Sequence, residues 1–204
     1  MKRLLLFLVL VCAATSHAQV QPSRKKLEAY LLMPEPAALR TDLSQIPQGA
    51  HKTVLSPAHE IADGLGVKIY SKEEFAKLGI GLEAFVERAK AAADARLKDL
   101  EPDFIKDDQG RTRYAVYRGD SSLIASLIAA PSLGKGFEKL LDGDLWAVLP
   151  DRHSLFLFPA KPEMLAEFAD DLAERYKTDA YAASCEVFLI KPGTAPKVVA
   201  TFGD

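Results

Sequence analysis

Cysteine is scarce in this sequence of 204 residues. It occurs twice, and one of the two, Cys12, lies in an apolar N-terminal stretch that we expect to be removed. The mature chain is then expected to contain Cys185 alone, so that no intramolecular disulfide can form. Cys185 alternates with Val187 and Leu189 along a predicted strand, which favours burial as a small apolar residue over reactivity.

Long apolar runs and an excess of one charge are also absent. A membrane-spanning helix needs about 20 apolar residues, and no stretch of the chain reaches that length, so no transmembrane segment is expected. The formal net charge is −2, and acidic and basic residues are dispersed along the chain. Such a balance gives no electrostatic reason to bind nucleic acid or an anionic membrane, so neither is expected as a partner.

Complete motifs for metal, phosphate or dinucleotide binding are missing. His59 and Glu60 begin a pattern typical of zinc proteases, but Asp63 stands where the second histidine ligand is required. Residues 133–137 contain two glycines and a lysine without the longer loop and the following Ser or Thr of a phosphate-binding loop. Residues 64–66 lack the third glycine of a dinucleotide fold. We therefore expect no cofactor and no metal.

The N-terminus is typical of a cleaved secretory signal. Two basic residues precede an apolar run over residues 4–14, and small residues occupy positions 16 and 18, which a signal peptidase reads. We expect cleavage after Ala18 and a mature chain of about 186 residues that starts at Gln19 in the periplasm or the extracellular medium. Because the removed segment contains two basic and no acidic residues, the net charge falls from −2 to about −4.

Composition divides the remaining chain at about residue 58. Residues 19–58 contain five prolines, each of which lacks an N–H group and restricts the residue before it. This predicts a Pro-rich leader with one short helix over 24–33. Residues 59–204 have the apolar content and the length of one domain. The predicted organisation is a signal peptide over 1–18, the leader and a single domain.

Residues 59–204 are predicted to intersperse hairpins with helices. Ser71 and Glu74 form a capping box for a short helix that ends at Gly79. An apolar residue at every third or fourth position predicts a longer helix over 82–100. The other predicted elements are helices over 131–141 and 162–176 and strands over 67–70, 104–106, 111–117, 123–129, 145–149, 155–158, 184–190 and 197–202. The pattern indicates a single α+β domain with a largely antiparallel sheet of hairpins packed against two main helices.

From about residue 60 to residue 204, a series of landmarks resembles a bacterial family of unknown function typified by YtpQ. The landmarks, in order, are Glu74-Phe75, Leu78-Gly79, Phe85 and Ala89, Asp120 to Ser126, Gly143-Asp144, Pro150-Asp151-Arg152 before Leu155, and Gly193. The resemblance implies a single α+β domain and brings no activity with it. This chain departs from the family at His153, where an acidic residue is expected, and in its signal, because the usual members are cytoplasmic.

Two loops contain the residue types of a hydrolytic triad. Asp120 and Ser121 lie in one loop, and Asp151 and His153 lie in another, with serine as the candidate nucleophile and histidine as the candidate base. No glycine-flanked serine elbow supports this hypothesis. The alternative is an ordinary hairpin turn, in which Asp151 accepts hydrogen bonds within the turn while Arg152 and His153 face solvent.

The sequence therefore favours an exported α+β domain that acts by binding or scaffolding in the cell envelope, with a protein of the envelope as its expected partner. The alternative hypothesis is a hydrolase that uses the loops of Asp120 and of Asp151 and His153. Geometry distinguishes the two, because an enzyme must bring nucleophile and base within about 3 Å, whereas a binding module needs no such convergence.

Overall fold

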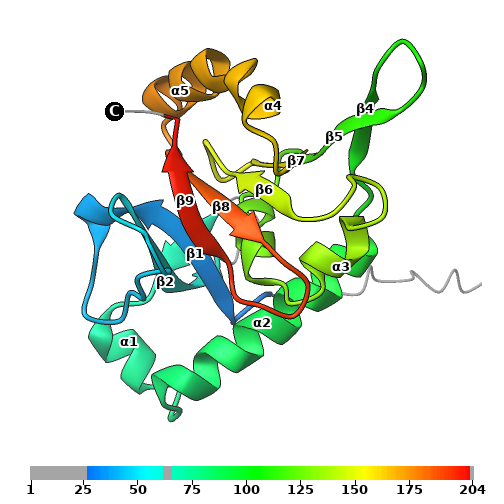
Figure 1. The fold of residues 1–204 in the computed structure, drawn as a ribbon. Coiled ribbons are helices and arrows are strands. Elements are labelled where there is room, and N and C mark those ends of the chain that lie inside the picture. The colour runs from blue at the N-terminus through cyan, green and yellow to red at the C-terminus, as the bar shows by residue number, and fades with distance from the viewer. Residues whose placement is uncertain (1–26, 62–65, 203–204) are drawn as a thin grey trace, which may run out of the picture.

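The computed structural model describes residues 27–61 and 66–202, so the predicted signal and its cleavage site lie outside the described residues. The chain forms a single α+β domain with two antiparallel sheets and helices around them (Figure 1). The predicted fold class is confirmed, with two sheets in place of one. Over the two described ranges, no helix has the length and the apolar character that crossing a bilayer requires.

The first sheet contains residues that the sequence analysis assigns to the leader. β1 (Leu31–Pro36) pairs antiparallel with β2 (Thr53–Glu60), which pairs antiparallel with β3 (Val67–Ile69). A short 3-10 helix, η1 (Ala37–Leu39), follows β1. The helix predicted over 24–33 is wrong, because residues 31–33 belong to strand β1 and residues 27–30 are not helical. The boundary at residue 58 falls inside β2.

The burial of β1 explains why this segment is extended. Leu31 and Met33 are buried in the largest cluster of apolar side chains, here called the main core, whereas Leu32 is buried in a separate cluster beside the first helices. Alternation between two buried faces is the period of a strand. β1 is an edge strand of its sheet, where proline at position 34 is tolerated.

The next two helices agree with the sequence analysis. α1 (Lys72–Ala76) begins at the predicted capping box, in which the Ser71 hydroxyl accepts from the Glu74 N–H and the Glu74 carboxylate accepts from the Ser71 N–H. Gly79, just after α1, has a φ of 65°, a conformation that glycine adopts without a Cβ clash. α2 (Leu82–Asp99) packs on β1 through the buried residues Phe85, Val86, Ala89 and Ala93.

The second sheet has six antiparallel strands in the order β4-β5-β7-β6-β8-β9. The predicted hairpins β4–β5, β6–β7 and β8–β9 are confirmed. β6 and β7 lie at the centre, as their continuous apolar runs indicate. The strands are β4 (Asp103–Lys106), β5 (Thr112–Arg118), β6 (Leu145–Val148), β7 (Ser154–Pro159), β8 (Glu186–Ile190) and β9 (Lys197–Thr201).

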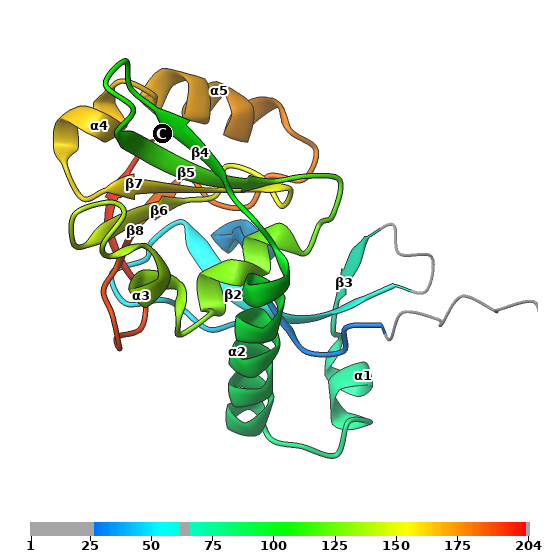
Figure 2. The same cartoon turned by 90° about the vertical axis from the view of Figure 1, so that its right-hand side faces the viewer.

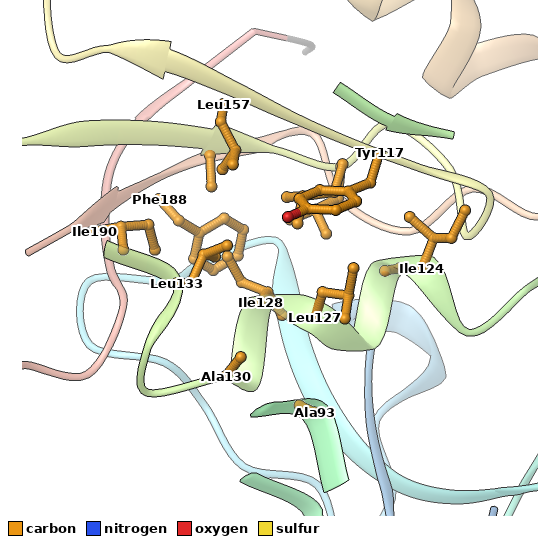
Figure 3. Close-up of a cluster of buried hydrophobic side chains, with 14 of the residues drawn as sticks. Ala93, Tyr117, Ile124, Leu127, Ile128, Ala130, Leu133, Leu157, Phe188 and Ile190 are labelled. Atoms are coloured by element: carbon orange, nitrogen blue, oxygen red, sulfur yellow. The ribbon is translucent and has the colours of Figure 1, made fainter. Parts of the chain in front are cut away.

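Residues 123–129 are not the predicted strand but largely a 3-10 helix, η2 (Ile124–Ala129). η2 lies in the main core, so its side chains are buried on nearly every side. Figure 3 shows Leu127 of η2 beneath Tyr117 and Leu157 of the second sheet. A segment that is apolar on all faces has no periodicity, which is why the pattern does not separate strand from helix here.

The helix predicted over 162–176 is two helices, α4 (Pro162–Ala166) and α5 (Ala169–Thr178), which cover the outer face of the second sheet (Figure 2). The break lies at Phe168, where φ and ψ are −111° and 0°. The ring of Phe168 packs 5.5 Å from the ring of Phe158, centroid to centroid, so the break places this ring against the sheet.

The second sheet therefore separates two apolar layers. Along β7, Leu155 and Leu157 belong to the main core, while Phe156 and Phe158 pack with the side chains beneath α5. On the side of the main core, the sheet is covered by η2, by α3 (Leu133–Phe137) and by the first sheet, with α2 beyond them (Figure 2). This arrangement leaves α3 close to the C-terminal end of α2.

Candidate functional site

The loop over 150–154 contains a fully buried carboxylate. Asp151 has no exposed surface. It accepts hydrogen bonds from the backbone N–H of His153 (2.8 Å) and from the hydroxyl of Ser154 (2.9 Å), and it forms an ion pair with Arg175 of α5. The predicted turn hydrogen bonds to Asp151 are thus confirmed. A buried charge is tolerated when it is paired and hydrogen-bonded in this way.

Arg152 does not face solvent, and the prediction that it does is wrong. It forms an ion pair with Glu35 of β1, whose side chain is only 3% exposed. Burial raises the pKa of the Glu35 carboxyl, while the charge and the hydrogen bond of Arg152 lower it by a smaller amount. The Nε of Arg152 is buried without a hydrogen-bond partner among the described residues. The expectation fails because it treats residues 19–58 as a leader. In the structure, this part of the chain contributes β1 and most of β2 to the first sheet, and Glu35 of β1 pairs with Arg152.

The two candidate catalytic loops are adjacent, but their functional groups do not form a triad. The Gly119 N–H donates to the carbonyl of His153 (3.2 Å), so the loops meet through their backbones. Asp120 and Ser121 are exposed, and the Ser121 hydroxyl accepts from the Leu123 N–H (3.3 Å). Within residues 27–61 and 66–202, no hydrogen bond joins Ser121 to His153.

The ring of His153 has a different neighbour. It packs edge-on against the ring of Tyr181, with centroids 5.4 Å apart and planes at 75°. Asp151 bonds the backbone N–H of His153 and not its ring nitrogen, so it does not orient the imidazole as a triad carboxylate would. The structure brings the two loops together without giving the histidine the contacts of a general base.

The incomplete zinc motif also lacks the contacts of a metal site. His59 lies at the end of β2, where its Nδ1 is 3.0 Å from the carbonyl of Glu60 and its ring packs 4.7 Å from that of Tyr70. Asp63 lies outside the described residues. In the part of the chain that the structure describes, no three His, Cys, Asp or Glu side chains are grouped as metal ligands would be.

A third buried carboxylate, that of Glu186, joins the two sheets. Its Oε1 accepts from the backbone N–H groups of His51 (2.7 Å) and Lys52 (3.0 Å), which precede β2, while Glu186 itself belongs to β8. The adjacent Cys185 is 2% exposed, which confirms its predicted burial, and burial raises the pKa of its thiol. The sequence contains no signal for the Glu186 contact, because the contact spans about 135 residues.

An apolar hollow lies between the C-terminal end of α2, the β4–β5 hairpin and α3, and we call it the α3 pocket. Its volume is about 380 Å³. Phe104 and Leu140 at its edge are 41% and 52% exposed, which is high for large apolar side chains. The pocket is lined by Leu97, Lys98, Pro102, Phe104, Tyr117, Ser132, Lys135, Gly136, Phe137 and Leu140.

The polar groups of the α3 pocket are few and lack partners. Tyr117 is 4% exposed, and its hydroxyl has no hydrogen-bond partner among the described residues. Burial raises the pKa of Tyr117 to about 12, so the phenol is a protonated donor at neutral pH. Lys98 and Lys135 are exposed, and the described residues offer neither lysine an ion pair or a hydrogen bond. Sequence reasoning missed this pocket, whose residues come from separate elements.

A smaller hollow of about 240 Å³ lies between the second sheet and α5. Four aromatic rings line it, together with Asp171, Leu172 and Arg175; the rings are those of Tyr114, Phe156, Phe158 and Phe168. Arg175 stacks 6.0 Å from the centroid of the Phe156 ring and is paired with Asp151. The charges of this hollow are therefore mixed in sign and partly neutralised.

Comparison with known proteins assigns no role to these sites. No family model, no curated protein and no solved structure matches the chain. The resemblance to the YtpQ-type family stays a prediction.

Proposed function

We propose that the protein is an exported, non-catalytic binding protein of the cell envelope. The observation that carries the binding function is the α3 pocket, an apolar hollow lined by the buried residue Tyr117, whose hydroxyl lacks a partner among the described residues, and by two lysines that also lack one there. Ligand sites in proteins are typically concave and mostly apolar, with a small number of polar groups that fix the ligand's orientation. Export rests on the basic start, the apolar run and the small residues of positions 1–18.

The contacts of the two candidate catalytic loops support binding over hydrolysis. The carboxylates that bond the loop of the candidate base, those of Asp151 and Glu35, are each paired with an arginine. The candidate nucleophile Ser121 bonds its own loop and not His153. An acyl-transfer site needs a base within hydrogen-bond reach of its nucleophile.

Export is tested by expressing the full chain in a bacterial host and measuring the intact mass of the protein in each cell fraction. We expect the periplasmic form to begin at Gln19. The control variant Leu8→Arg places a charge in the apolar run and should leave the full-length protein in the cytoplasm. A wild-type protein that stays uncleaved in the cytoplasm would refute the export proposal.

The non-catalytic part is tested with ester, peptide and phosphate-ester substrates. We expect the variants Ser121→Ala and His153→Ala to turn over these substrates no more slowly than the wild type does. A hydrolytic rate that either substitution abolishes, in a protein that keeps its fold by circular dichroism, would replace the binding proposal with the hydrolase hypothesis.

A further inference from the structure

The charges that line the α3 pocket have one sign. Lys98 from α2 and Lys135 from α3 line the pocket, and no aspartate or glutamate does. Ser132 also lines the pocket, but its hydroxyl already donates a hydrogen bond to the carboxylate of Asp94 (2.7 Å). An unpaired pair of ammonium groups at the edge of an apolar hollow favours an anion there.

The interior of the pocket adds a hydrogen-bond donor. Tyr117 lies within the main core, with its ring between the second sheet and η2 (Figure 3). Its ring packs edge-on against Phe137, with centroids 6.0 Å apart, and this fixes the ring's position. The Tyr117 hydroxyl is not among the fully buried side-chain atoms of the described residues that lack a partner, which belong to Arg96, Arg152 and Glu186, so this hydroxyl is accessible from the pocket that Tyr117 lines. A ligand atom in the pocket can therefore accept a hydrogen bond from this hydroxyl.

We propose that the α3 pocket binds a small amphipathic anion, an apolar chain that ends in a carboxylate. The apolar side chains, Phe104, Phe137, Leu97 and Leu140 among them, contact the chain. The carboxylate accepts from the Tyr117 hydroxyl and is neutralised by Lys98 and Lys135. This inference names the ligand class of the proposed binding function and rests on it.

Gly136 offers a position for a blocking variant. A Cβ added at Gly136 meets no atom within 4 Å, and Gly136 lines the pocket. The substitution Gly136→Leu is therefore expected to leave the fold intact and to fill the hollow. It serves as a blocking variant that changes no charge and no hydrogen bond.

The experiment measures decanoate binding to the purified mature protein by isothermal titration calorimetry. We expect saturable binding of one decanoate, and we expect Gly136→Leu to abolish it. Tyr117→Phe, which keeps the ring, should weaken binding about tenfold, since a hydrogen bond to a charged group is lost. Lys98→Ala and Lys135→Ala should each weaken it about two- to fivefold, and by less at high salt.

Matched controls separate the ligand class from general stickiness. Lys139→Ala removes a neighbouring exposed lysine that does not line the pocket and should leave binding unchanged. Decanol has the same chain without the charge and should bind at least tenfold more weakly than decanoate. Decyltrimethylammonium should bind no better than decanol. Equal binding of all three compounds, or decanoate binding that Gly136→Leu leaves intact, would overturn the proposal.

A second measurement keeps the failure of the ligand class apart from the failure of the binding function. Native mass spectrometry of the exported protein compares the wild type with Gly136→Leu. A retained carboxylate that only the wild type holds supports the proposal. A neutral or cationic ligand held in the same way overturns the ligand class but supports the binding function. No retained ligand, together with no decanoate binding, overturns both.

Discussion

Removal of Arg175 tests whether the loop over 150–154 is held by a buried ion pair. Arg175→Ala leaves the carboxylate of Asp151, which has no exposed surface, without its counter-charge. Breaking a buried pair costs about 3–5 kcal/mol, and we expect a somewhat smaller loss here, about 2–4 kcal/mol. The cost is reduced because two hydrogen bonds to Asp151 remain and because the Arg175 side chain is 43% exposed, so solvent already screens the pair.

The charge itself is isolated by a second substitution. Asp151→Asn removes the negative charge and keeps a similar shape, so the double variant Arg175→Ala/Asp151→Asn should be about 1 kcal/mol more stable than Arg175→Ala alone. Arg113 provides the matched control, because it also stacks on a ring, that of Phe168, but its partner Glu167 is half exposed. Arg113→Ala is expected to leave the unfolding midpoint close to that of the wild type.

Urea unfolding measures these differences through the fluorescence of Trp146, the chain's single tryptophan, which packs with the side chains beneath α5. The free energy of unfolding follows from linear extrapolation to zero urea. An Arg175→Ala variant within about 0.5 kcal/mol of the wild type, the range of ordinary surface substitutions, would refute the reasoning. So would a double variant that is less stable than Arg175→Ala.

Three further predictions follow from burial. Phe158→Ala should lower the free energy of unfolding by about 3–5 kcal/mol and His153→Ala by less than about 1 kcal/mol in the same urea assay, and the reverse order would contradict the fold. Thiol labelling of Cys185 should be slow in the native protein and fast in urea; rapid native labelling would refute its burial. Because the pKa of Tyr117 is raised to about 12 in the folded protein, the free energy of unfolding should fall as pH rises from about 10 to 12. In urea titrations across this range, the free energy of Tyr117→Phe should fall less steeply than that of the wild type, because the titrating phenol is gone.

The local signals in the sequence were sufficient for most of residues 67–202. Hairpins were predictable where turn residues separate two apolar runs, and α1 was predictable because its capping box is a contact between residues three apart. The failures have a common cause. η2 is buried on nearly every side, so it has no period, and β1 has apolar residues on both faces that also fit a helical spacing. Their conformation is decided by the sheets that they contact, which lie far away in the sequence.

The candidate site was less predictable than the fold. Asp151 was correctly expected to accept hydrogen bonds in its turn, since these partners lie two and three residues away. The partners of Arg152 and Glu186 are more than 100 residues distant in the chain. The α3 pocket is formed by residues from α2, two strands and α3, each of which reads as ordinary amphipathic structure by itself.

The loop over 150–154 and the α3 pocket both contain charged side chains, but within the described ranges only those of the loop are paired. Arg152 and Asp151 are consecutive, and their side chains reach opposite sides of the second sheet, one to Glu35 of the first sheet and the other to Arg175 of α5. Each charge is thus paired and holds a layer in place, and the one buried atom of these two side chains that lacks a partner in the described part of the chain, the Nε of Arg152, is closed off from solvent. In the α3 pocket, the ammonium groups of two lysines and the Tyr117 hydroxyl lack partners among the described residues, and the surrounding surface is apolar. Groups whose bonding capacity the fold leaves unused are the ones that a ligand can satisfy, which is why the pocket and not the loop is the site to test first.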